Sequence, residues 1–301
     1  MDNFRRRLKM DVNDYIENTE FTELSNNLLD ISEVPDDVAG ICKFVQGNLI
    51  HSYWLEHYDV EVEHSNKLSE MQIRHAKDLV SLAMSKSGEA SHVFKQPRHR
   101  VVSICRDFSL LVCSILRLKG VPARLRSGFA TYLSQNQFED HWVCEYWDNR
   151  KGWVAIDAQL DQVHHQILKF DFDPCDVPSS HFIVAGQAWK KCRNNLELAE
   201  DFGFRDFNGL PFIKGSLIRD LFALSKFEMH TWDTGWGILP NFISPISGES
   251  ELVLLDELAE VSCSSDSSKA RKLVESRSEI MLPDDWNCSK FPTLRELYAA
   301  L

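Results

Sequence analysis

Hydrophobic residues recur at helical spacing in several stretches of the chain. Within residues 38–49 apolar side chains return every three or four positions, which predicts one apolar helix face, and we expect residues 1–50 to be largely helical. A second amphipathic helix is predicted over residues 67–86, where Ser87 and Gly88 end it. Residues 89–102 show little periodicity and are predicted to form a loop.

The clearest helical pattern begins near Cys105. Its apolar positions follow the i, i+3, i+4, i+7, i+8 rule of a helix with one buried stripe: Phe108, Leu111, Val112, Ile115 and Leu116. Ser103 is a predicted N-cap, and Asp107 adds negative charge in the first turn, where the helix dipole favours it. Gly120 followed by Pro122 ends the helix. Cys105 is therefore expected in the first helical turn.

Three segments after this helix have the composition of strands. They cover residues 121–129, 141–147 and 152–157. The last two are joined by the turn-rich sequence Asp-Asn-Arg-Lys, which predicts an antiparallel hairpin.

The register of this hairpin decides whether two polar residues share a face. Side chains alternate along a strand. If Trp147 pairs with Lys151 or Trp153, then His141 and Asp157 fall on one face of the hairpin, whereas a slip of one residue separates them.

The remainder of the chain is predicted to be mainly helical. Helices are expected over residues 183–202, 215–229, 250–260 and 268–279, and the Ser-rich segment between the last two is predicted to be exposed. We therefore divide the chain into a helical N-terminal part of the core (residues 1–88), a core segment that holds the three predicted strands (89–180) and a mainly helical C-terminal extension (181–301).

Composition narrows the possible partners. The 301 residues include 44% hydrophobic residues and carry a net charge of −12, which argues against nucleic acid or an anionic membrane as a partner. No apolar run of signal-peptide or membrane-spanning length is present, so a cytoplasmic protein is expected. The eight cysteines include no Cys-x-x-Cys pair, which predicts free thiols and neither a metal site nor a cofactor. The paired His164 and His165 are predicted to be a surface feature.

Cys105, His141 and Asp157 are the candidate catalytic residues. The first turn of a helix lowers the pKa of a thiol and favours the reactive thiolate. An imidazole can hold this thiolate and later protonate a leaving group, and a carboxylate can orient the imidazole. The alternative is that Cys105 is one of several small buried hydrophobic side chains without a chemical role.

The motifs around these three residues carry a family resemblance. The sequence C-R-D-F-S-L-L-V-C-S-I-L-R-L-K-G-V-P-A-R, followed by D-H-W-V-C-E-Y and G-W-V-A-I-D, resembles the core of the transglutaminase-like superfamily. The family's catalytic Cys, His and Asp fall on Cys105, His141 and Asp157. The chain departs from the family pattern in having D-H-W-V instead of D-H-x-W, and Ala-Gln after Asp157 instead of Pro-Thr.

The resemblance implies an α+β, papain-like fold with a catalytic helix packed on an antiparallel sheet and helical additions at both ends. It also implies acyl transfer through a Cys105 thioester on a peptide, protein or amide substrate, with water or an amine as acceptor. The alternative is a binding module that holds a peptide in the same cleft without catalysis.

Four further residues are candidates for substrate binding. Arg106 could bind substrate or steady the thiolate, with a solvated arginine as the alternative. Acyl transfer needs an oxyanion hole, for which the Cys105 backbone N–H is one expected donor. The indole N–H groups of Trp54, Trp232 and Trp236 are candidates for the second donor of the oxyanion hole.

Overall fold

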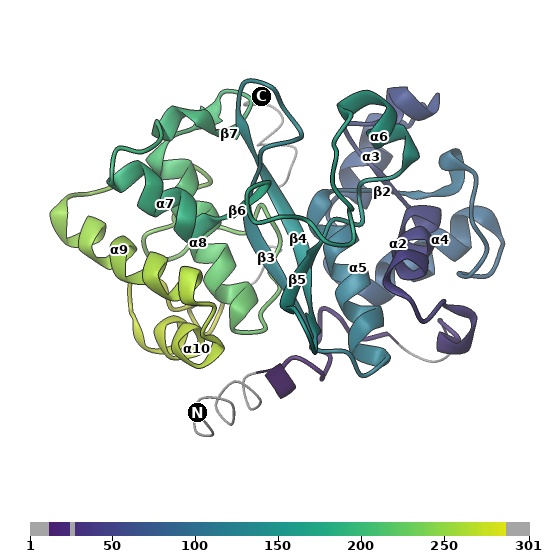
Figure 1. Ribbon diagram of the computed structural model, residues 1–301, viewed down its shortest axis with the longest axis horizontal. Helices are drawn as coiled ribbons and strands as arrows, with labels where there is room; N and C mark the ends of the chain where they lie inside the picture. Colours follow the sequence, from purple (N-terminus) through teal and green to yellow (C-terminus); the bar gives the residue numbers. More distant parts are fainter. Residues whose placement is uncertain (1–11, 25–27, 287–301) are drawn as a thin grey trace. The chain divides into compact units, whose positions relative to one another are not determined.

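The computed structural model describes residues 12–24 and 28–286 (Figure 1). Their contacts divide the chain into two compact units. The first comprises Met1–Leu125 and Val143–Val177, and the second comprises Arg126–Trp142 and Pro178–Leu301. The predicted division at residues 88 and 180 stays a prediction, and each unit is described by itself below.

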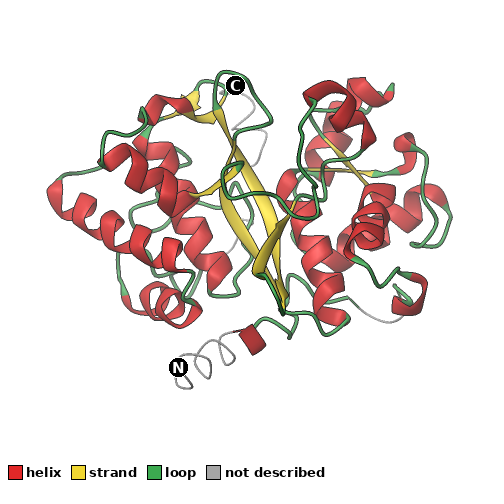
Figure 2. Ribbon diagram, viewed as in Figure 1, coloured by secondary structure: helices red, strands yellow, loops and turns green. Residues whose placement is uncertain are grey.

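The first unit contains short strands and several helices (Figure 2). Its elements are α2 (Val38–Asn48), β1 (Leu49–His51), α3 (His64–Glu70), α4 (Ala76–Ser87), β2 (Val101–Ser103), α5 (Cys105–Leu118), β5 (Gly152–Ile156) and α6 (Gln162–Leu168). The strands β1 and β2 form a parallel pair in which Leu49 lies opposite Val101. Helices α2 and α4 both pack against α5.

The second unit is mainly helical. Its elements are β6 (Phe182–Val184), α7 (Ala185–Arg193), β7 (Phe202–Phe204), β8 (Phe207–Asn208), α8 (Leu210–Leu224), α9 (Glu249–Ser264) and α10 (Ser267–Ser276). The helices pack on one another around a hydrophobic core that includes Trp189, Leu217, Leu221, Leu255 and Leu258. Two long strands, β3 (Ala123–Ala130) and β4 (Phe138–Asp148), contribute residues to both units.

The larger sheet has six strands in the order β6-β3-β4-β7-β8, with β5 paired to β4. The pairs β3–β6, β4–β5 and β7–β8 are antiparallel, and β4–β7 is parallel. The predicted α+β class is confirmed, and the parallel β4–β7 pairing makes the sheet mixed.

Several predicted helix boundaries are wrong for identifiable reasons. The helix expected over residues 67–86 is two helices, because the backbone turns after Glu70 and the N–H of Ala76 donates to the distant Phe21 carbonyl at 2.8 Å. The helix expected over residues 183–202 begins at Ala185, because the residues before it form β6 and pair with β3, with Phe129 opposite Ile183. Within the described part of residues 1–50, α2 is the one α-helix longer than a single turn.

The Ser-rich segment is predicted to be exposed, but α9 extends through its first three residues to Ser264, and its first serine, Ser262, is buried. The Ser262 hydroxyl donates to the Asp220 carboxylate at 2.6 Å, and its oxygen accepts the Gly186 N–H at 3.1 Å. Asp220 also accepts two hydrogen bonds at 2.9 Å from the buried Arg126 guanidinium. Ser262 therefore belongs to a buried polar cluster that joins α7, α8 and α9.

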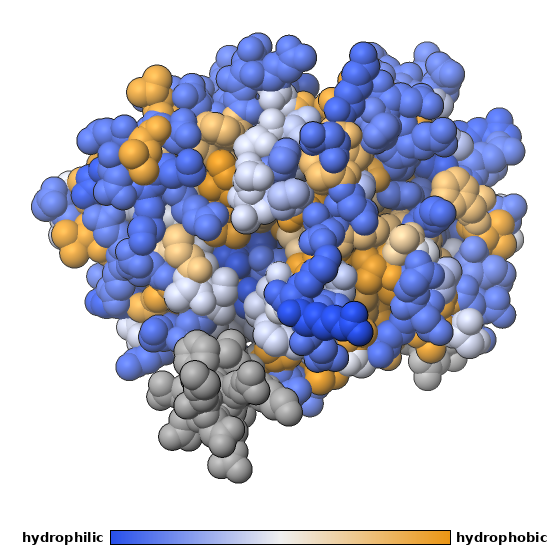
Figure 3. Space-filling model, in the orientation of Figure 1, coloured by the Kyte–Doolittle hydropathy of each residue, from blue (hydrophilic) through white to orange (hydrophobic). Residues whose placement is uncertain are grey.

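The surface shows no broad apolar face in the view of Figure 3. Polar side chains cover most of that face, and hydrophobic residues are exposed between them. This agrees with the high content of charged residues, 26% of the chain.

Candidate active site

Cys105 is the first residue of α5, as predicted, and 8% of it is exposed. The sequence pattern predicted one apolar stripe, but every residue of α5 from Cys105 to Arg117 is buried. A helix enclosed on all sides is held in one position, since none of its faces can move without disturbing packed neighbours. Cys105 is thus placed at the start of the most enclosed helix of the first unit.

The N-cap of α5 is Ile104 and not the predicted Ser103. The capping function is supplied from inside the helix, because the Asp107 carboxylate accepts the Ile104 N–H at 3.0 Å. This is the reverse half of a capping box. Burial raises the pKa of Asp107 to about 6, against the opposing effect of the Arg106 guanidinium.

Arg106 is fully buried, so the solvated alternative is wrong. Its guanidinium donates to Asp107 at 3.2 Å and to the Arg74 carbonyl at 2.9 Å. Through these contacts the charged side chain of Arg106 stabilises the first turn of α5. Its predicted role in substrate binding stays a prediction.

Asp157 follows β5 directly and is 2% exposed. Its N–H donates to the Pro174 carbonyl at 2.8 Å, and its carboxylate accepts the Gln159 N–H at 3.1 Å. The side chain of Gln46 on α2 donates to the carbonyls of Ala158 and Leu160 at 3.1 and 3.2 Å. The turn in which Asp157 lies is therefore held by the Gln46 side chain on α2 and by the Pro174 carbonyl of a neighbouring loop.

His141 lies in β4 and is 1% exposed. The rings of Tyr132 and Phe182 meet its imidazole edge-on, with centroids at 6.0 and 6.5 Å. The preceding Asp140 accepts a hydrogen bond from Ser216 at 3.3 Å, and burial raises the pKa of Asp140 to about 6. His141 is therefore held by aromatic packing next to a titratable carboxyl group.

The hairpin register agrees with the prediction. Trp147 lies opposite Trp153, and Glu145 lies opposite Ala155. Because side chains alternate, His141 is in phase with Glu145 along β4, and Asp157 is in phase with Ala155 after β5. Cys105 and Asp157 belong to the first unit, and His141 belongs to the second, two positions before the first unit resumes at Val143.

The three candidate tryptophans have different surroundings. Trp236 is 3% exposed and its indole N–H donates to the Ile280 carbonyl at 2.8 Å, so this donor is already used in the core of the second unit. Trp232 is half-buried in the same unit, against the rings of His230 and Phe242. Trp54 is half-buried in the first unit. Their roles toward substrate stay predictions.

His164 lies in a polar cluster that the sequence pattern did not indicate. The expectation that His164 lies on the surface is wrong, because it is 1% exposed and its Nδ1 lies 2.9 Å from the Asp161 carboxylate. Tyr58 donates to the same carboxylate at 2.6 Å, and the Trp54 ring lies on the imidazole with centroids 4.0 Å apart. Burial, followed by this hydrogen bond, raises the pKa of Tyr58 well above its usual value. The spacing of Asp161 and His164 by one helical turn is the sequence feature that could have indicated it.

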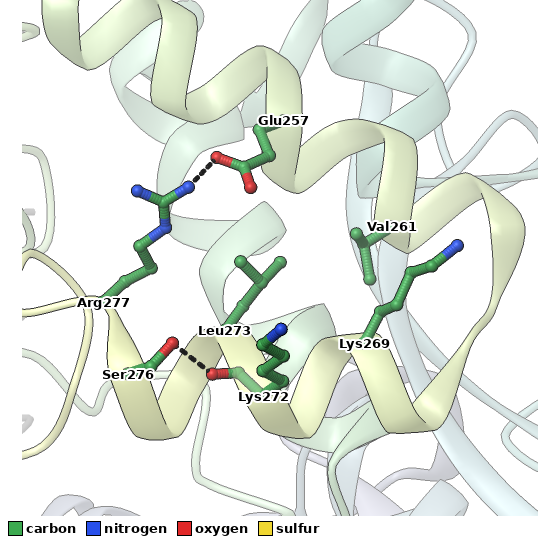
Figure 4. A pocket seen from close by; sticks show the side chains of 7 residues that line it. All are labelled: Glu257, Val261, Lys269, Lys272, Leu273, Ser276 and Arg277. Atoms are coloured by element: carbon green, nitrogen blue, oxygen red, sulfur yellow. Dashed lines mark hydrogen bonds and ion pairs between the residues drawn. The ribbon is translucent and has the colours of Figure 1, made fainter.

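The second unit contains a cavity of about 530 Å³ whose lining residues differ from the candidate catalytic residues. It lies along α9 and α10 and is lined by Glu257, Val261, Lys269, Lys272, Leu273, Ser276 and Arg277 (Figure 4). Arg277 forms an ion pair with Glu257 across it. The lining contains neither a cysteine nor a histidine, so this cavity does not fit thiol catalysis.

Residues 12–24 and 28–286 contain no group of three or more His, Cys, Asp or Glu side chains placed to hold a metal ion. Among the same residues, none of the helices is long and apolar enough to span a bilayer.

Comparison with known proteins gives a partial match. Residues 65–158 match the family model of the transglutaminase-like superfamily. A protein-glutamine gamma-glutamyltransferase from Pseudomonas aeruginosa is 28% identical over 113 residues, which cover 32% of this chain and 16% of the relative. The chain therefore spans about a sixth of that relative.

Two solved structures show a weak similarity to parts of this chain. A candidate cysteine protease from Cytophaga hutchinsonii is 15% identical with a TM-score of 0.36, over 58% of this chain and 45% of that one. Red sea bream transglutaminase is 18% identical with a TM-score of 0.31, over 47% of this chain and 24% of that one.

Proposed function

We propose that this protein transfers acyl groups through a thioester on Cys105, because residues 65–158 match the family model of the transglutaminase-like superfamily. The main observation behind this proposal is that Cys105 is the first residue of the enclosed helix α5, within the matched residues 65–158. His141 and Asp157 fall in the same segment and share one phase of the β4–β5 hairpin. They are the proposed proton carrier and the residue that orients it.

The proposed reaction begins with the Cys105 thiolate. The sulfur attacks the carbonyl carbon of a carboxamide, and the C–N bond breaks as His141 protonates the departing amine or ammonia. Asp157 accepts a hydrogen bond from the other ring nitrogen and holds the imidazole in position. Water or a primary amine then attacks the thioester, which releases an acid or a new amide.

The proposed substrate class is taken from the name of the Pseudomonas aeruginosa relative. Its name describes transfer of the γ-glutamyl group of protein-bound glutamine. We therefore propose the side-chain carboxamide of glutamine in a peptide or protein as the first acyl donor to test. A peptide bond and a small-molecule amide are the other members of the proposed class.

The direct test is to trap the acyl-enzyme. The full chain is incubated with glutamine-containing peptides, with and without a primary amine, and analysed by intact mass spectrometry and by ammonia release. We expect a mass increase that maps to Cys105, is lost in Cys105→Ser and is discharged by the amine. Cys113→Ser is the matched control, because Cys113 is a fully buried cysteine of the same helix.

The non-catalytic binding module predicts a different pattern. In that case Cys105 alkylates no faster near neutral pH than the other thiols, and Cys105→Ala keeps full peptide affinity with no acyl adduct in the wild type. An activated Cys105 should instead alkylate well below the free-thiol pKa of about 8.5. His141→Gln should slow that alkylation at pH 7 without unfolding the protein, as judged by circular dichroism.

A further inference from the structure

Two cysteines of the first unit other than Cys105 form a close pair of thiols. The sulfurs of Cys42 on α2 and Cys175 in the loop after α6 are 4.0 Å apart, although 133 positions separate the residues. Cys42 is 5% exposed and Cys175 is half-buried. Both line one cavity of about 330 Å³, together with Gln46, Leu160, Phe172 and Pro174 among other residues. Solvent and small molecules can therefore reach the pair.

We propose that Cys42 and Cys175 form a reversible disulfide when the protein meets hydrogen peroxide. A disulfide requires sulfurs about 2.05 Å apart, so the pair must close by roughly 2 Å. Cys175 lies in an irregular loop, where side-chain rotation and a small backbone shift can provide this movement. Disulfide formation at this pair requires no acyl transfer and stands independently of it.

The two thiols have different roles in the reaction. The hydrogen bond with Cys42 lowers the pKa of Cys175, and the same hydrogen bond raises the pKa of Cys42. Cys175 is also the more exposed sulfur. Cys175 is therefore the thiolate that reacts with the oxidant, and Cys42 is the thiol that then attacks the oxidised Cys175 sulfur.

The step balances with peroxide as the oxidant. The Cys175 thiolate attacks one oxygen of hydrogen peroxide, the O–O bond breaks, and the departing hydroxide takes a proton to become water. The sulfur of Cys42 then attacks the resulting Cys175 sulfenic acid, so that the S–O bond breaks and a second water leaves with the Cys42 proton. The two thiols lose two electrons, and the peroxide gains them.

The surroundings favour a small neutral oxidant. The negative charges of Asp173 and Asp37 raise the pKa of Cys175, against the larger effect of the hydrogen bond with Cys42. The Asp173 carboxylate also accepts the Cys175 N–H at 2.9 Å. Negative charge at this place opposes the approach of an anionic disulfide such as oxidised glutathione. Hydrogen peroxide carries no charge and fits the cavity.

The pair also lies beside the turn that holds Asp157. The residue before Cys175 accepts the Asp157 N–H, and the N–H of Val177 donates to the Ala155 carbonyl at 2.9 Å. On the other side, α2 carries Cys42 and reaches the same turn through Gln46. A disulfide would tie together the two elements that brace this turn, and the Asp157 amide should exchange its hydrogen more slowly in the oxidised protein.

The test is disulfide mapping of the full chain. Reduced protein is treated with hydrogen peroxide, blocked with N-ethylmaleimide, digested without reduction and analysed by mass spectrometry. We expect a linked peptide containing Cys42 and Cys175 that disappears on adding a thiol reductant. The fully buried Cys113 and Cys144 serve as internal controls and should remain reduced at the same dose.

Variants separate the two roles. Cys175→Ser should abolish the linked peptide and leave Cys42 reduced, whereas Cys42→Ser should leave a Cys175 sulfenic acid that dimedone traps. The matched control Cys192→Ser, a half-buried cysteine of the second unit, should keep the link. A wild-type protein in which Cys175 is oxidised without joining Cys42, or joins another cysteine, would overturn the proposal. Circular dichroism establishes that each variant is folded.

Discussion

The buried carboxyl group of Asp107 provides the sharpest stability prediction. Asp107 caps the helix that begins with Cys105, is fully buried, and has a pKa raised to about 6 by that burial. An unfolded aspartate titrates near 3.8. The folded protein therefore binds this proton more tightly than the unfolded chain does. The stability contributed by the protonated carboxyl is fully present below pH 3.8 and is lost as the pH rises through about 6.

The magnitude follows from the two pKa values. A difference of about two pKa units corresponds to about 3 kcal/mol when the titration is complete, and the part that falls between pH 4 and pH 7 is about 2 kcal/mol. Asp107→Asn keeps the size of the side chain and an oxygen for the Ile104 N–H, but it cannot titrate. The free energy of unfolding of the wild type, relative to Asp107→Asn, should therefore fall by about 2 kcal/mol from pH 4 to pH 7.

The assay is urea unfolding followed by tryptophan fluorescence, with both proteins measured at each pH. Other carboxyl groups titrate in both proteins and cancel in the difference. A difference that is flat would show that the attraction of Arg106 cancels the effect of burial, and one that rises with pH would show that it outweighs burial; either result contradicts the prediction.

Two further predictions concern the second unit. Asp220→Ala should destabilise the second unit by about 3–5 kcal/mol, because the buried Arg126 guanidinium loses its carboxylate partner. The control Glu260→Ala removes an exposed ion pair and should cost less than about 1 kcal/mol. Equal losses of stability in the two variants would contradict the prediction. Gly186→Ala should cost about 1–3 kcal/mol, since a Cβ there would lie 2.6 Å from the side chain of Ser262. Thermal unfolding measures both, and an unchanged midpoint in Gly186→Ala would show that α7 and α9 can separate without cost.

Local pattern was enough to predict the helix at Cys105 and the hairpin that follows it. The helix at Cys105 and the pairing of Trp147 with Trp153 were confirmed, because periodicity and turn composition act over a few residues. The motifs around Cys105, His141 and Asp157 were sufficient to indicate a resemblance to the transglutaminase-like superfamily, whose family model matches residues 65–158. Their joint role in catalysis stays a prediction.

Tertiary contacts decided what the sequence pattern could not. The break between α3 and α4 depends on the carbonyl of Phe21, and the burial of Ser262 and His164 depends on partners on other elements. The sulfurs of Cys42 and Cys175 meet only because the fold brings a helix and a distant loop to one cavity. Residue spacing along a chain encodes faces and turns, whereas the pairing of polar groups far apart in sequence is set by how those faces pack.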